Sequence, residues 1–107
     1  MATIKVLIGD DGIPYTDSCC KKFGKGRAPI KWKLDSHFAS THKLAGVLGL
    51  PNPPFIPKPP TGGDINYEND NKGLGKHPKT YAYEIAVIDT TTSLLSTGKA
   101  IIRNDPG

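Results

Sequence analysis

The chain has few of the residues from which metal and redox sites are built, and it has no long apolar segment. It contains two cysteines, three histidines and one methionine in 107 residues. Cys19 and Cys20 are adjacent rather than spaced as Cys-x-x-Cys, so we expect a buried pair of reduced thiols. No apolar run approaches the roughly 18 residues of a membrane span, and no basic leader precedes one. We therefore expect a cytoplasmic protein without membrane contact, although a processed secreted form would have the same sequence.

Apolar residues are also scarce, at 36% of the chain, whereas glycine and proline are abundant, with 12 and 10 residues. A chain of this length buries one modest core, so we expect residues 1–107 to form a single domain. The glycines and prolines predict many turns and long connections rather than helices.

Four segments alternate large apolar residues with small or polar ones, which predicts half-buried β-strands. They lie at residues 3–8, 30–34, 81–89 and 99–103. In the second segment Trp32 falls on the apolar side, so we expect its ring to be in the core. The pattern predicts an all-β fold, a small β-sandwich of about seven strands.

The remaining segments read as connections. Residues 13–28 are expected to form a long polar connection, and helix is expected only within residues 35–50. Six prolines in residues 51–60 exclude a helix or a central strand and predict an extended, polyproline-like segment. Residues 61–78 are rich in glycine, asparagine and aspartate, which predicts a mobile loop with at most a short strand.

The segment Tyr81-x-Tyr83-x-Ile85-x-Val87 follows a glycine-rich stretch and precedes a turn and a last strand. This arrangement resembles immunoglobulin-like and cupredoxin-like β-sandwiches. In such folds a tyrosine near the start of the penultimate strand bonds back to the preceding corner, a place that Tyr81 or Tyr83 would fill. The resemblance implies the fold without blue copper, because residues 89–96 hold neither the cysteine nor the histidine of that site.

Two groups of side chains could in principle hold a metal ion. The candidate zinc ligands are Cys19, Cys20, His37 and His42. The candidate calcium ligands are Asp64, Asn66, Glu68 and Asp70. The first group lacks chelating spacing and the second fails the EF-hand pattern, so we expect thiols, surface histidines and a solvated acidic loop, with no metal and no cofactor. No nucleophile elbow or phosphate-binding loop is present either, so we do not expect an enzyme.

The charge is uneven along a chain whose net charge is +4. The candidate binding residues form one basic stretch: Lys21, Lys22, Lys25, Arg27, Lys31 and Lys33. Phe23, Trp32 and Phe38 are interleaved with them, and basic residues with aromatic neighbours can hold nucleic acid. The position of Trp32 on the core side favours a solvated lysine face instead.

These observations favour a non-catalytic binding or structural module that contacts a protein partner, or a second copy, through its loops or an edge strand. The alternative is a weakly specific nucleic-acid or polyanion binder that uses the basic stretch of residues 21–43. A metal-dependent enzyme is the third hypothesis.

Overall fold

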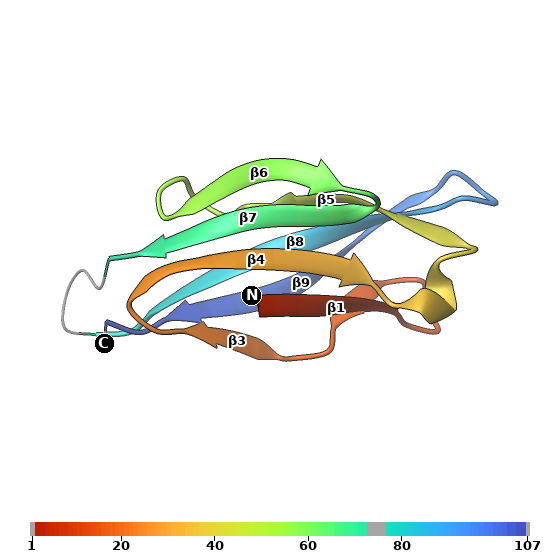
Figure 1. Ribbon diagram of the computed structural model, residues 1–107. Coiled ribbons are helices and arrows are strands. Elements are labelled where there is room, and N and C mark those ends of the chain that lie inside the picture. Colours follow the sequence, from red (N-terminus) through yellow and green to blue (C-terminus); the bar gives the residue numbers. More distant parts are fainter. Residues whose placement is uncertain (1, 73–76, 107) are drawn as a thin grey trace.

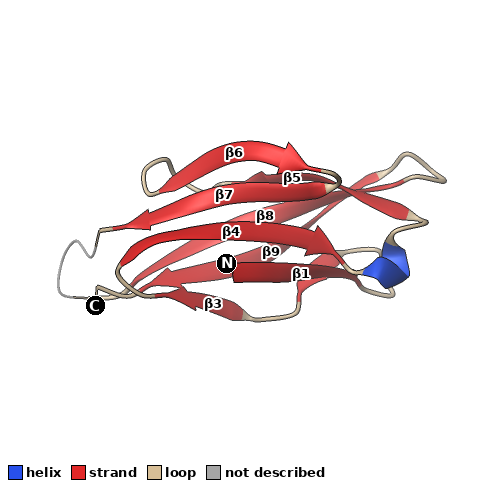
Figure 2. Ribbon diagram, viewed as in Figure 1, coloured by secondary structure: helices blue, strands red, loops and turns tan. Residues whose placement is uncertain are grey.

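The computed structural model describes residues 2–72 and 77–106, and these fold into strands with one short 3-10 turn (Figures 1 and 2). The strands are β1 (Ala2–Ile8), β2 (Pro14–Thr16), β3 (Cys20–Phe23), β4 (Gly26–Leu34), β5 (His42–Leu48), β6 (Phe55–Thr61), β7 (Asp64–Asn71), β8 (Lys79–Asp89) and β9 (Leu95–Asn104). The predicted all-β sandwich is therefore confirmed, with nine strands in the described residues rather than about seven.

The strands form two sheets that face each other (Figure 1). One sheet has the order β2-β1-β4-β7-β6, and the other has the order β3-β9-β8-β5. β1 runs parallel to β4 and β3 runs parallel to β9, whereas the other neighbours are antiparallel. The last two strands of the chain, β8 and β9, form a long hairpin in the middle of the smaller sheet.

The core lies between the sheets and is built from one face of each central strand. The alternation predicted for the four strand segments is confirmed, since β1, β4 and β9 bury alternate side chains and β8 does so except at Ala86, which is also buried. Trp32 is fully buried, and its indole N–H donates to the Tyr83 hydroxyl oxygen at 3.1 Å. The Trp32 ring also makes edge-to-face contacts with Tyr67 and Tyr83.

Two close contacts, one of backbone and one of side-chain amides, join the sheets away from this aromatic cluster. At Gly98, a Cβ atom would lie 1.8 Å from the carbonyl oxygen of Pro14, so β2 approaches β9 as closely as a glycine allows. At the other end, the buried amides of Asn69 and Asn104 exchange two hydrogen bonds, at 2.7 and 3.1 Å. The Asn71 side chain also donates to backbone carbonyls there, including that of Asp105 at 2.8 Å.

The predicted polar connection over residues 13–28 is wrong, because β2, β3 and the start of β4 occupy most of it. The predicted buried pair of thiols is also wrong. Cys19 and Cys20 form a disulfide bond in the β2–β3 connection, where Cys19 is exposed and Cys20 half-buried. These strands lie at sheet edges, which places the cysteines at the surface.

Within residues 35–78 two expectations are confirmed and one is corrected. Helix is limited to the 3-10 turn Ser36–Phe38, inside the expected range, and the Asp35 carboxylate caps it by accepting the His37 N–H at 2.9 Å. The proline-rich segment is extended as expected, but it pairs with β7 as the edge strand β6. The predicted loop over residues 61–78 contains β7, an eight-residue strand, while residues 73–76 lie outside the described residues.

Candidate binding groove

The edge strands of an open sandwich carry backbone donors and acceptors that no neighbouring strand pairs. The four edges here are β2, β3, β5 and β6. β2 and β3 have three and four residues, and β6 contains three prolines, which have no N–H group. β5 has seven residues and no proline. It is the long edge, among the described strands, on which another strand could pair.

One hydrogen bond shows which β5 groups face this open edge. The N–H of Thr90 donates to the carbonyl of Thr41 at 2.9 Å, just before β5. In an antiparallel ladder every second residue forms its backbone hydrogen bonds with the same neighbouring strand. Lys43, two residues after Thr41, therefore also bonds to β8. His42 and Leu44 therefore direct their N–H and C=O groups away from β8, towards the edge.

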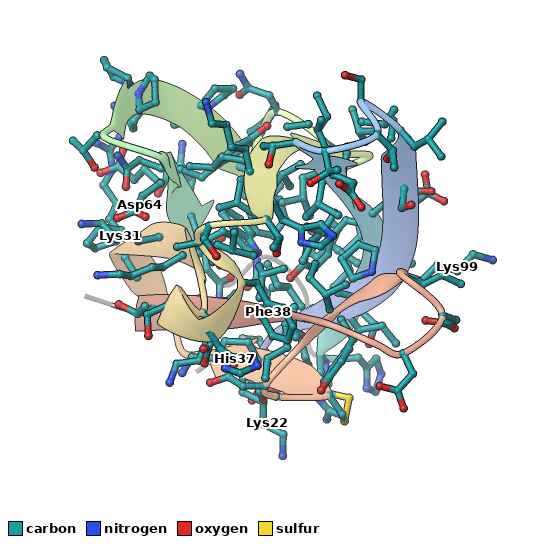
Figure 3. All side chains as sticks on the ribbon, turned by 90° about the vertical axis from the view of Figure 1, so that its right-hand side faces the viewer. Lys22, Lys31, His37, Phe38, Asp64 and Lys99 are labelled. Carbon is teal, nitrogen blue, oxygen red and sulfur yellow. A yellow bond between two sulfur atoms is a disulfide. The ribbon has the colours of Figure 1, made fainter. Side chains whose placement is uncertain are left out.

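A groove of about 980 Å³ runs along β5 and is bounded on its other side by β6 and β7. Its apolar lining consists mainly of Leu44, Val47, Pro57, Ile65 and Tyr67. The groove exists because β5 packs against β7 and β4, whereas β6 extends past the edge of the smaller sheet. β5 and β6 consequently lie along the same long side of the sandwich (Figures 1 and 3).

Lysines surround this apolar surface. Lys33, Lys43 and Lys58 line the groove, against one carboxylate, that of Asp64. The Asp64 carboxylate pairs with Lys31 at 3.8 Å, on the outer face of the larger sheet (Figure 3). Lys58 pairs with Glu68 at 3.7 Å. Lys33 and Lys43 make no ion pair with any described residue, so the groove carries uncompensated positive charge.

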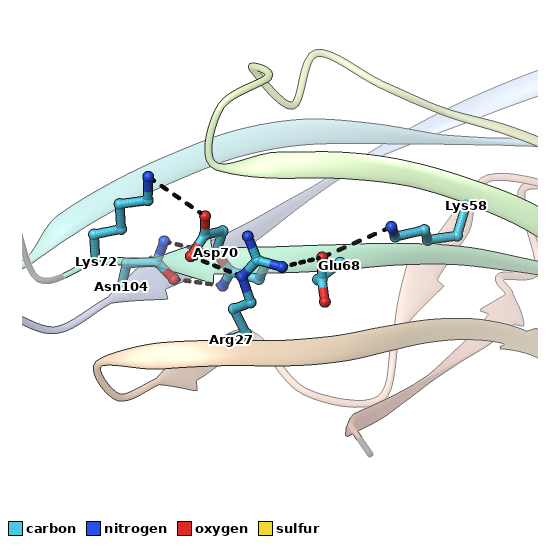
Figure 4. Close-up of polar contacts among 7 residues, drawn as sticks. Arg27, Lys58, Glu68, Asp70, Lys72 and Asn104 are labelled. Carbon is cyan, nitrogen blue, oxygen red and sulfur yellow. Dashed lines mark hydrogen bonds and ion pairs between the residues drawn. The ribbon is translucent and has the colours of Figure 1, made fainter.

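The basic stretch predicted from the sequence does not form one surface. Lys31 and Lys33 lie near the end of β4, and Lys33 lines the groove. The other four residues lie at the opposite end of the sandwich, around the β3–β4 turn: Lys21, Lys22, Lys25 and Arg27. Arg27 is neutralised there by Glu68 and Asp70, at 3.7 and 3.5 Å (Figure 4).

Cations from the second half of the chain join that far end, and the sequence analysis missed them. They are Lys72, Lys79 and Arg103. Lys22 and Arg103 are direct neighbours in the register of β3 and β9, and Arg103 also pairs with Asp105 at 3.2 Å. The strand order that brings these residues together cannot be read from their spacing of about 80 residues.

The residues considered as metal ligands are otherwise engaged. The two cysteines are bonded to each other, which removes both thiolates. The alternating series from Asp64 to Asp70 is the outer face of β7, and its three carboxylates pair with Arg27, Lys31, Lys58 and Lys72 (Figure 4). Residues 2–72 and 77–106 contain no group of three or more His, Cys, Asp or Glu side chains placed to hold a metal ion.

Two groups have shifted pKa values, and both shifts have structural causes. Burial raises the pKa of Tyr83 to about 12, although the hydrogen bond from Trp32 opposes this. The backbone N–H groups of Thr91 and Thr92 lower the pKa of Asp89, which caps the β8–β9 turn. Neither Tyr83 nor Asp89 lines the groove.

Comparison of the sequence with models of known protein families gives no match, and comparison with curated proteins gives none either. The described residues also contain no helix with the length and apolarity needed to cross a lipid bilayer.

Proposed function

We propose that the protein is a non-catalytic binding module that pairs an extended segment of a protein partner with the edge of β5. The observation that supports this is the coincidence of an unblocked seven-residue edge with an apolar groove. In strand addition, main-chain hydrogen bonds supply affinity and pockets for alternate side chains supply specificity. Both features lie along β5.

The numbers of strands in the two sheets support the same proposal. The larger sheet has five strands and the smaller has four. A segment paired with β5 would become the fifth strand of the smaller sheet and would lie beneath β6. It would cover Pro57, Ile65 and Tyr67, which line the groove. Burial of this apolar surface would add to the backbone hydrogen bonds.

A proline substitution at β5 tests this proposal directly. Leu44→Pro removes an N–H that faces the open edge, while Leu44→Ala truncates the same side chain and keeps the N–H. The probe is a fluorescein-labelled peptide of about eight residues, alternating valine with serine, followed by fluorescence anisotropy. We expect Leu44→Ala, which removes part of the apolar lining, to weaken binding modestly and Leu44→Pro to abolish it. Equal binding by the two variants would exclude strand pairing at β5.

Self-association through β5 is the other form that strand pairing can take. Two copies paired at this edge would bring their Lys43 side chains onto the same sheet face, which is unfavourable for like charges. We therefore expect sedimentation velocity to show a monomer. A dimer that becomes monomeric in Leu44→Pro but not in Leu44→Ala would instead identify a second copy as the occupant.

A second candidate function is polyanion binding at the far end of the sandwich. The position of Lys22 beside Arg103 favours it, because Lys22 forms no ion pair with a described residue, whereas Arg103 is paired with Asp105, and a bound anion would compensate the charge of Lys22. Replacing Lys22, Lys25 and Lys79 with serine should then abolish low-salt binding of single-stranded nucleic acid, and Lys31→Ser with Lys33→Ser should not. If both sets reduce binding equally, only net charge is being detected.

A further inference from the structure

The two faces of a strand added to β5 would meet different surroundings. Leu44 and Val47 point between the sheets, and Val47 is buried there. Lys43 is exposed and pairs with Ile88 on the outer face of the smaller sheet. Successive side chains of an added strand would therefore point alternately into the groove and towards the surface that Lys43 shares.

The inward positions of such a strand would contact apolar surface. Pro57, Ile65 and Tyr67 line the groove opposite β5, and Ile65 and Tyr67 pack against the core. An inward charged side chain would lose water there without gaining a partner, because Asp64 is already paired with Lys31, and Lys33, which follows the buried Trp32, lies on the outer face of β4. Apolar side chains are therefore favoured at every second position.

The outward positions would lie beside Lys43, which is on the neighbouring strand and is exposed on the outer face of the smaller sheet. Lys43 forms no ion pair with a described residue, and cross-strand pairs of opposite charge stabilise a sheet. Charge complementarity thus favours carboxylates at these positions.

Building on the proposed strand pairing, we infer that the partner is an extended acidic segment in which aspartate or glutamate alternates with apolar residues. Main-chain pairing to β5 would supply the part of the affinity that does not depend on the side chains of the partner. Lys43 would select the acidic residues, and the apolar groove would select the residues between them.

The experiment compares three labelled peptides of about eight residues that share valine at alternate positions and carry aspartate, serine or lysine at the others. We expect the aspartate peptide to bind the wild-type chain about threefold more tightly than the serine peptide, and the lysine peptide most weakly. Lys43→Glu should reverse the order of the aspartate and lysine peptides. Lys22→Glu is the matched control, since it changes the net charge equally at the opposite end of the molecule.

Each outcome distinguishes this inference from the function on which it rests. Equal affinity for the aspartate and serine peptides, unchanged by Lys43→Glu, would overturn the acidic preference and leave strand pairing intact. Reversal by Lys22→Glu as well would overturn it too, because the preference would then follow net charge alone. If none of the three peptides binds the wild-type chain, both the function and the inference fail.

Discussion

The buried tyrosine at the centre of the sandwich predicts a loss of stability at alkaline pH. Tyr83 is almost fully buried, and its hydroxyl oxygen accepts a hydrogen bond from the indole N–H of Trp32. Burial raises its pKa from 10.0 to about 12. The neutral phenol of Tyr83 is therefore favoured in the folded chain, whereas the same phenol in the unfolded chain ionises from about pH 10 upwards.

The sign and size of the effect follow from linkage. Between the two pKa values the unfolded state binds fewer protons, so the free energy of unfolding falls as pH rises. The contribution of Tyr83 is fully present below pH 10 and declines towards pH 12. Because each pH unit between the two pKa values corresponds to about 1.4 kcal/mol, we expect roughly 1.4 kcal/mol to be lost at pH 11, and roughly 2.3 kcal/mol at pH 12, where the folded chain is itself half ionised.

Urea unfolding followed by tryptophan fluorescence measures this loss, since Trp32 is the single tryptophan and lies against Tyr83. Tyr83→Phe is the control variant. It leaves the indole N–H without its acceptor and should cost about 1–3 kcal/mol at every pH, but it should remove the alkaline decline that Tyr83 causes. If the wild-type chain and Tyr83→Phe lose stability in parallel between pH 9 and 11, the assignment of the raised pKa to this residue is wrong.

Three other features give further predictions. Gly98→Ala should destabilise the chain by about 3 kcal/mol or more, because its Cβ would collide with backbone, whereas Gly46→Ala meets open space and should be nearly neutral in the same urea experiment. Asn69→Leu should cost about 1–3 kcal/mol by leaving the Asn104 amide unpaired, and the double variant with Asn104→Leu should cost less than the sum of the single variants. An NMR titration of Asp89 should give a pKa below 3.8, and a value at or above 3.8 would show that the turn N–H groups do not stabilise the carboxylate.

The strands that the sequence predicts are those with one apolar face. β1, β4, β8 and β9 each bury alternate apolar side chains, and this local pattern is sufficient to identify them. In β7, Ile65 and Tyr67 lie opposite the buried Trp32 and Ile30, but Asn69 occupies the next inward position, which an apolar residue would normally fill. Its amide is satisfied by Asn104, which is 35 residues away, so no local rule could identify it as a core residue.

The groove escaped prediction for two physical reasons. A bulge between Leu44 and Gly46 breaks the alternation of β5, and the glycines of that segment made a strand hard to distinguish from a weak helix. The groove also depends on β6 extending past β5, and strand order across two sheets is a tertiary property. The proline rule nevertheless excluded a central position for residues 51–60, and β6 is an edge strand.

The basic residues predicted to form one surface do not do so, because residues a few positions apart in sequence lie far apart along an extended strand. Arg27 and Lys31 both lie on the outer face of β4, which explains their shared exposure to water. However, the strand carries them towards opposite ends of the sandwich, and the carboxylates of β7 neutralise them individually. Charge counted along the chain therefore overestimated the positive surface near Arg27 and missed the contribution of Lys79 and Arg103 beside it.

The two edges beside the groove restrict strand pairing in different ways. In β6, Pro57, Pro59 and Pro60 remove N–H donors, so no partner of any composition can complete a ladder there. In β5, Lys43 and the bulge also disfavour indiscriminate pairing, as lysines and bulges do at many sheet edges. Unlike proline, however, they leave the outward donors of His42 and Leu44 in place. A lysine repels a second copy of itself but attracts a carboxylate. Lys43 therefore selects among the strands that could pair with β5, whereas the prolines of β6 exclude every strand from that edge.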